Sequence, residues 1–300
     1  MNYDFNTLTT ISLDYDDGVT IDPQLICYAH AKDVRVVIDV IFDAEVVNLG
    51  NFTWEQEYIN TLLTMMQDNY LDGLNFDIEQ SFSGMSSALF TAFLAQLTYQ
   101  FKLVAPYCQI SMDTTFSPDI GRNFDYTGLA DSIDYIIMMD YDITNMINDP
   151  LPDILSGIQK FLDLQIPPNK LIAALPWYGF DNICTSKSIE DMNCDTVTDS
   201  VDIMLDGVLA IINDANITST GEIWSDANTM PFINYIHPSD NRVHQAWYEN
   251  PQSVAAKVAA IKPFNLGGIG VFQFETIVGT AVPASIQQQM WDATSSFLTK

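Results

Sequence analysis

Three polar residues, Asn75, Asp77 and Glu79, alternate with apolar residues in the segment 74–79. On a β-strand alternate side chains share a face, so the three polar groups should point the same way. Burying two carboxyls side by side is costly, and desolvation with mutual repulsion should raise the pKa of one of them. A carboxylic acid of this kind can donate a proton near neutral pH. We predict Glu79, nearest the strand's end, as the donor; an acidic strand end that only faces water is the alternative.

The segments around this motif alternate between strand-like and helix-like patterns, which is typical of helices packed around a parallel sheet. The strands are expected at Thr10–Leu13, Val34–Phe42, Gly73–Ile78, Gln109–Asp113, Ile133–Met139, Lys170–Leu175 and Gly268–Phe272. The helices are expected at Trp54–Asn69, Ser86–Ala105, Pro152–Leu164, Ser253–Ile261 and Ala284–Phe297. Strands this apolar are covered on both faces.

This pattern predicts one α/β domain over residues 1–300, a TIM-type (β/α)8 barrel. A closed barrel needs eight strands, and seven are recognised. The first strand is expected to be missing at the N-terminus, since the first recognised strand begins about ten residues from Met1. A strand overlooked elsewhere, or an open doubly wound sheet, are the alternatives.

The alternation breaks at residues 177–250, which we interpret as an α+β insertion after the seventh barrel strand. Two strand-like runs, 231–236 and 243–248, flank a polar turn and predict an antiparallel hairpin. The insertion follows a strand's carboxyl end, where barrel enzymes place their active sites, so it could wall a cleft. Cys184 and Cys194 lie in a polar stretch that suits a short disulfide loop, although spacing alone does not establish the bond.

The chain carries 39 acidic and 11 basic residues, a net charge of -28. Such a surface repels phosphate backbones and anionic lipid, so a neutral ligand is expected, and neither nucleic acid nor membrane. His30, His237 and His244 show no metal-ligand spacing, so neither a metal nor a cofactor is inferred. The possible disulfide and two glycosylation patterns, at Asn51 and Asn216, favour a secretory protein, although no signal peptide is present. A secreted or lysosomal protein is expected, and a monomer.

The segment 72–79, Asp-Gly-Leu-Asn-Phe-Asp-Ile-Glu, resembles the catalytic signature of the family 18 glycoside hydrolases, the chitinase family. The usual form of that signature is Asp-Gly-x-Asp-x-Asp-x-Glu, and chitobiase-like members carry asparagine at the position of Asn75. The resemblance to the chitobiase-like members extends over nearly the whole chain. It is carried by residues 27–30, 77–80, 125–131, 139–142, 176–179, 244–248, 250–253 and 268–270.

The resemblance implies retaining hydrolysis of β-1,4-linked N-acetylglucosamine oligosaccharides, assisted by the substrate's own 2-acetamido group. Glu79 is the implied acid and base. Asp77 is expected to hold the acetamido N–H, and Tyr141 to donate a hydrogen bond to its carbonyl oxygen. Because Asp77 and Glu79 leave one strand on one side, they could not easily flank a sugar from opposite faces, as the two-carboxylate scheme requires.

Other residues are candidates for supporting roles. Asp142 is expected to orient Tyr141 or another group of the cleft, or else to cap a turn. Asp72 is expected to cap the turn into its strand and to support Asp77 indirectly. The other substrate-binding candidates are Asn75, Trp177, Tyr178 and Trp247, and the three aromatic residues among them serve equally well as core residues.

One departure from the family concerns Phe272, which stands where the family has a tryptophan that forms the floor beneath the reacting sugar. Phenylalanine offers a smaller apolar floor without the indole N–H. From the resemblance as a whole, the expected function is a chitobiase-like exo-acting hydrolase. A lectin-like oligosaccharide-binding protein and an endo-acting chitinase are the alternatives.

Overall fold

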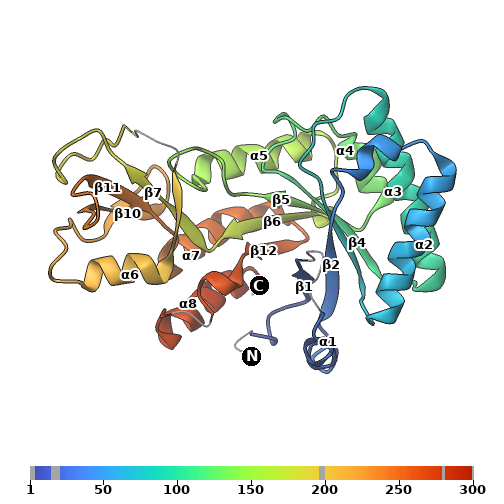
Figure 1. Cartoon of the computed structure of the whole chain (residues 1–300), viewed down its shortest axis with the longest axis horizontal. Helices are drawn as coiled ribbons and strands as arrows, with labels where there is room; N and C mark the ends of the chain where they lie inside the picture. The colour runs from blue at the N-terminus through green and yellow to red at the C-terminus, as the bar shows by residue number, and fades with distance from the viewer. Residues whose placement is uncertain (1–3, 15–20, 196–199, 279–280, 299–300) are drawn as a thin grey trace. The chain divides into compact units, whose positions relative to one another are not determined.

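The computed structural model describes residues 4–14, 21–195, 200–278 and 281–298, in two compact units (Figure 1). We call Asp4–Met138 with Gln159–Ile172 the N-terminal unit, and Met139–Ile158 with Ala173–Lys300 the C-terminal unit. The motif segment 72–79 lies in the N-terminal unit, and the predicted insertion lies in the C-terminal unit.

In the N-terminal unit strands and helices alternate along the chain as predicted. The elements are β1 (Thr10–Leu13), α1 (Pro23–His30), β2 (Arg35–Ile41), α2 (Phe52–Asp68), β3 (Gly73–Asp77), α3 (Met85–Val104), β4 (Gln109–Thr115), α4 (Tyr126–Ser132) and β5 (Tyr135–Met139). Strands β1 to β4 pair in parallel with their sequence neighbours. The short helices α1 and α4 were not predicted, because seven or eight residues carry little periodicity.

A helix cap and a cluster of aromatic rings stabilise the N-terminal unit. Asn51 accepts a hydrogen bond from the backbone N–H of Trp54 (3.3 Å) and so starts α2. The ring of Phe42, beyond the end of β2, lies 5.8 Å from that of Phe76 on β3 and 5.2 Å from that of Phe93 on α3. These rings fill the space between the sheet and its helices.

The C-terminal unit contains most of β6 (Leu171–Pro176) and all of β12 (Gly268–Phe272), with helices α5 (Leu151–Asp163, shared between the units), α7 (Pro251–Ile261) and α8 (Ala284–Ser295). Between β6 and α7 the chain forms β7 (Tyr178–Ile183), β8 (Val201–Met204), α6 (Leu205–Asn213), β9 (Ile223–Ser225), β10 (Met230–Ile236) and β11 (Val243–Trp247). Short 3₁₀ turns complete the described residues at Glu45–Asn48, Pro168–Lys170, Lys262–Phe264, Phe274–Thr276 and Ser296–Leu298.

Among the described residues the main sheet has seven strands in the order β1-β2-β3-β4-β5-β6-β12. This sequential order is that of a (β/α)8 barrel with one strand fewer than the closed form. The doubly wound alternative is wrong, because that sheet would reverse its strand order at a switch point.

The segment after β6 forms a separate five-stranded sheet in the order β8-β7-β11-β10-β9. The predicted hairpin is confirmed, since β10 pairs antiparallel with β11 from Ile236↔Val243 to Phe232↔Trp247. The predicted disulfide is also present: Cys184 and Cys194 are bonded and pack against Val243. Within the predicted insertion, residues 196–199 lie outside the described residues. Among the helices that the structure describes, none has the length and apolar character needed to span a membrane.

Candidate active site

The carboxyl end of β3 in the N-terminal unit has the predicted polar face. Leu74, Phe76 and Ile78 are fully buried on the opposite side of the chain. The glycine of the motif has a packing role, because a Cβ on Gly73 would lie 1.8 Å from the backbone oxygen of Gln109 on β4. Gly73 therefore permits the close pairing of β3 with β4 that sets the direction of the motif's side chains.

Asn75 is buried at the centre of a polar network across three strands. Its amide nitrogen donates to Asp39 of β2 (3.1 Å) and to Asp113 of β4 (2.6 Å), and its oxygen accepts a hydrogen bond from Ser111 (2.8 Å). The strand register explains the network, because Asp39, Asn75 and Ser111 lie side by side. An amide fits this place better than a third carboxylate, since it supplies two donors to two acidic neighbours.

Three carboxyl groups of this face hold their protons more tightly than usual. Burial, with the charge of Glu79 second, raises the pKa of Asp77 to about 6, while Arg122 opposes the rise. Burial and the charge of Asp77 raise the pKa of Asp39 to about 7. Burial beside both of these groups raises the pKa of Asp113 well above its usual value. The sequence linked a raised pKa to the proton donor Glu79, whereas in the structure the raised pKa is found at Asp77, because Asp77 is the more buried of the two motif carboxyls.

Glu79 lies at the end of the motif with its side chain 62% exposed. One carboxylate oxygen pairs with the guanidinium of Arg122 at 3.2 Å. Arg122 is itself buried and also donates to the backbone oxygen of Ile78. Asp43 accepts hydrogen bonds from the backbone N–H groups of Glu79 (2.9 Å) and Gln80 (3.1 Å), which fix the chain as it leaves the strand.

Four residues of this site were missed from the sequence: Asp39, Asp43, Asp113 and Arg122. Asp39 and Asp113 had a usable signal, because each is the one acidic residue in its predicted strand. Arg122 had none, since it lies in a loop 43 residues beyond Glu79.

Asp72 lies at the opposite end of β3 from Asp77. Its carboxylate accepts a hydrogen bond from the backbone N–H of Val36 (2.8 Å) and pairs with His30 (2.8 Å). Asp72 thus ties the start of β3 to β2 and to the end of α1. The contacts that the structure describes for this carboxylate do not include Asp77.

In the C-terminal unit, Tyr141 and Phe272 stack with their ring centroids 4.9 Å apart. Tyr178 meets both rings edge-on, at 6.4 Å from Tyr141 and 6.2 Å from Phe272. The Tyr178 hydroxyl donates to Asp142 (2.7 Å), and the backbone N–H of Asp142 donates to the side chain of Asn148 (2.6 Å). The carboxylate of Asp142 thus bonds Tyr178, whereas the sequence had left open whether it orients Tyr141, orients another group or caps a turn.

Trp177 and Trp247 occupy core positions. Trp177 is 1% exposed and packs edge-on against Trp291 at 4.8 Å. Trp247 is 6% exposed, stacks on Phe232 at 4.4 Å and donates its indole N–H to Gln245. Of the predicted aromatic sugar contacts, Phe272 has a substantial open surface at 42% exposure, whereas these two indoles are covered by protein.

The fold also places two histidines that are separated in the sequence close together. Although the histidine spacing suggested no metal, the fold brings His237 and His244 together with Asp240 at the tip of the β10–β11 hairpin. Among the described residues this is the group of histidine and carboxylate ligands compact enough to hold an ion.

Comparison with known proteins gives a consistent result. Residues 48–276 match the family described as "Glycosyl hydrolases family 18". The chain is 32% identical to the "Probable di-N-acetylchitobiase 2" of Dictyostelium discoideum, over 99% of this chain and 82% of that protein. It is 30% identical to the "Di-N-acetylchitobiase" of Mus musculus, over 97% of this chain and 84% of that protein.

Among solved structures, the chain is similar to the GH18 chitinase from Cycas revoluta in complex with (GlcNAc)3. The TM-score is 0.81 at 15% identity, covering 99% of this chain and 95% of that chain. The "C-terminal domain of putative chitinase" from Desulfitobacterium hafniense gives a TM-score of 0.78 at 18% identity, covering 97% of this chain and 90% of that chain. At these identities the likeness concerns the fold, and it confirms the predicted TIM-type architecture.

Proposed function

Because the chain belongs to family 18 of the glycosyl hydrolases and is a chitobiase-like glycoside hydrolase, we propose that it cleaves β-1,4-linked N-acetylglucosamine oligosaccharides with retention of configuration. The observation that carries this proposal is that the two motif carboxyls differ in burial. Asp77 is enclosed with a raised pKa, and Glu79 is accessible two residues further on.

Glu79 is the proposed acid and base. It protonates the glycosidic oxygen as the bond to the anomeric carbon breaks, while the 2-acetamido oxygen of the same sugar bonds to that carbon. The acetamido group and the anomeric carbon thus close an oxazolinium-like ring. Water then attacks the anomeric carbon and opens this oxazolinium-like ring, and Glu79 accepts the proton that the water loses. No enzyme nucleophile is needed, which agrees with two carboxyls that leave one strand on the same side.

Asp77 is proposed to accept a hydrogen bond from the acetamido N–H and to offset the positive charge that develops on the ring. Its Oδ1 is buried without a hydrogen-bond partner among the described residues, so it has an acceptor available. Tyr141 is proposed to donate a hydrogen bond to the acetamido carbonyl. Asn75 and Asp142 are proposed to hold neighbouring groups in place, and Phe272 to contact the sugar. Tyr178 is only 6% exposed and donates its hydroxyl to Asp142, so its proposed role is to support the ring of Phe272.

Burial argues against Trp177 and Trp247 as sugar-binding residues in this proposal. The similar di-N-acetylchitobiases and the chitinase bound to (GlcNAc)3 support this class of substrate. We further propose that the protein acts as a secreted or lysosomal monomer.

A lectin-like role is the second candidate, and Phe272 favours it. An exposed phenyl ring stacked on Tyr141 can bind a sugar's apolar face, whereas the family's tryptophan, which also shapes the reacting ring, is replaced. The two roles differ in whether bound oligosaccharide is cleaved.

The test is hydrolysis of chitobiose and chitotriose between pH 4 and 8 by the parent, Glu79→Gln and Glu57→Gln. Glu57 is an exposed acid on α2 and serves as the matched control. We expect Glu79→Gln to lose about 10²- to 10⁴-fold in kcat and Glu57→Gln to match the parent. Proton NMR of the first product should show the β-anomer. Binding without cleavage by the parent would favour the lectin, and an α-anomer would refute retention.

A further inference from the structure

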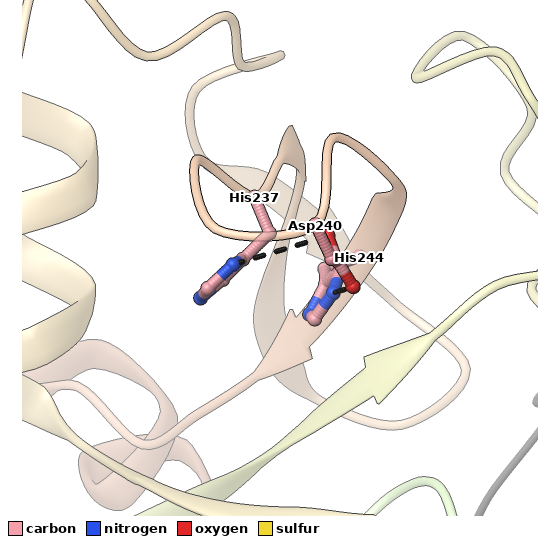
Figure 2. Close-up of side chains that lie close together, drawn as sticks. All are labelled: His237, Asp240 and His244. Carbon is pink, nitrogen blue, oxygen red and sulfur yellow. Dashed lines mark hydrogen bonds and ion pairs between the residues drawn. The ribbon is translucent and has the colours of Figure 1, made fainter.

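The tip of the β10–β11 hairpin gathers two of the chain's three histidines with one aspartate (Figure 2). His237 follows the last residue of β10, Asp240 lies in the turn, and His244 is the second residue of β11. One ligand atom from each side chain lies within 4.8 Å of the others. All three residues belong to the C-terminal unit, and none takes part in the proposed hydrolysis.

The distances approach those of a coordination sphere. His244 Nε2 and Asp240 Oδ2 are 3.2 Å apart, and His237 Nδ1 and Asp240 Oδ1 are 3.9 Å apart. A tetrahedral zinc ion with ligand bonds of about 2.0–2.1 Å requires ligand atoms about 3.3 Å apart. The side chains of His237 and Asp240 are about one-third exposed, so both can rotate toward an ion, and His237 Nδ1 would exchange its 2.9 Å contact with the hydroxyl of Ser239 for the metal.

A fourth residue orients the most buried ligand. Asp181 of β7 contacts His244 Nδ1 at 2.6 Å, which leaves Nε2 directed at Asp240. A carboxylate on the outer nitrogen of a histidine is the arrangement that fixes the ring of metal-bound histidines.

The hairpin is held rigidly in this conformation. His237 and Arg242 bond across the turn (2.9 Å), and His244 and Ala246 of β11 lie opposite Ile183 and Asp181 of β7. The Cys184–Cys194 disulfide packs against Val243, the residue before His244. Because the backbone that carries the ligands is already fixed, only side-chain rotations are needed, and little entropy is lost on binding an ion.

We propose that His237, Asp240 and His244 bind one divalent transition-metal ion of the zinc class, with solvent at the fourth position and Asp181 supporting His244. Two imidazoles and one carboxylate suit zinc better than calcium or magnesium, which prefer all-oxygen ligands. The ion would bind side chains on both sides of the turn and so hold its two ends together. Its role is to stabilise the hairpin, and it takes no part in cleaving the sugar bond.

The test is equilibrium dialysis of metal-stripped protein against Zn²⁺, with the bound metal counted per chain. We expect one ion per chain, and at least about tenfold weaker binding in His237→Gln and in Asp240→Asn. Both changes are at partly exposed positions, so folding should survive, as circular dichroism would check. Asp181→Asn should weaken binding about tenfold while leaving one ion per chain.

Two controls separate this site from other ligands. His30→Gln removes the third histidine, and Cys27→Ser removes an exposed thiol; both should bind Zn²⁺ within about twofold of the parent. Co²⁺ should give the visible absorption of a four-coordinate site in the parent, and Zn²⁺ should raise the Tm of the parent but not of His237→Gln. No bound ion in the parent, or binding unchanged in both His237→Gln and Asp240→Asn, would overturn the proposal.

Discussion

At the scale of single residues, the two carboxyls of the motif differ because of what surrounds them. Asp77 is partly buried, and burial with the charge of Glu79 raises its pKa to about 6. Glu79 leaves the sheet edge and meets the guanidinium of Arg122. Arg122 pairs with the carboxylate of Glu79, and its charge lowers the pKa of Asp77. We regard it as a positioning residue.

Replacing Arg122 with glutamine should therefore shift the pH profile. Loss of its charge raises the pKa of Asp77 further, so the acidic limb of kcat/KM, which reports ionised Asp77, should move to higher pH. At pH 5 we expect about two- to tenfold lower kcat/KM, with a smaller loss at pH 7. Arg122→Lys keeps the positive charge, so the acidic limb of its kcat/KM profile should lie close to that of the parent. An unshifted limb in Arg122→Gln would disprove this role.

Phe272 is the proposed sugar contact of the C-terminal unit. Phe272→Trp should enlarge the stacking surface beside Tyr141 and restore an indole N–H. We expect turnover of chitotriose to increase about two- to tenfold, in line with roughly 0.5–1.5 kcal/mol for an added aromatic contact. Phe52→Trp, at an exposed position on α2, is the matched control and should change nothing. No gain in Phe272→Trp would count against a floor role for this residue.

At the scale of elements, the pairing of β3 with β4 depends on Gly73. In Gly73→Ala the new methyl group would collide with the backbone oxygen of Gln109, and backbone cannot move aside as a side chain can. We expect a loss of about 2 kcal/mol or more in the free energy of unfolding, measured in urea. Gly207→Ala in α6, where the added carbon meets only Ile203 at 3.5 Å, should be neutral or stabilising by up to ~1 kcal/mol. Equal stability of both variants would contradict this packing argument.

Helix α7 is anchored by a buried cation. Lys257 is fully buried between Asp149 (2.5 Å) and Glu249 (2.7 Å), and these two acids keep its pKa raised despite burial. Lys257→Met would leave acidic groups buried without a counter-charge, and should cost about 3–5 kcal/mol in the free energy of unfolding.

The matched control for Lys257 is Lys160→Met. Lys160 pairs with Asp119 on the surface, where the ion pair is screened by solvent, and its loss should cost well under ~1 kcal/mol. Chemical denaturation of both variants measures the difference. Similar losses would show that burial of the Lys257 pair has no special weight.

At the scale of the whole molecule, buried acids link stability to pH. Burial raises the pKa of Asp39 to about 7 and that of Asp77 to about 6, and it also raises the pKa of Asp113 and Asp140. The folded chain thus binds more protons than the unfolded chain between about pH 4 and 7. Stability should be fully present below pH 4 for these groups and fall as pH rises through 7. Repulsion within a net charge of -28 acts in the same direction.

We therefore expect the free energy of unfolding in urea to be about 2 kcal/mol or more higher at pH 5 than at pH 7.5. Asp113→Asn, which removes one of the proton-binding groups, should reduce this difference. Asp214→Asn, at an exposed turn, should leave it unchanged. Stability that rises between pH 5 and 7.5 would refute the linkage.

Local sequence patterns were enough to predict most elements of the fold. The seven strands of the main sheet and five of its helices were predicted within a few residues, because long apolar periods and Pro or Gly boundaries are properties of neighbouring residues. Strands β7, β8 and β9 were missed, since each is short and becomes a strand by pairing with distant segments.

The sequence by itself determined the polar face of β3, the alternation of strands and helices, the hairpin of the insertion and the residues that resemble family 18. Only the tertiary structure decided that Arg122 contacts Glu79, that Asp39 and Asp113 flank Asn75, that Trp177 and Trp247 are buried, and that His237, Asp240 and His244 meet. The physical reason is that alternation along a strand follows from backbone geometry. Partners, burial and pKa depend instead on residues that are far apart in the chain and come together only on folding.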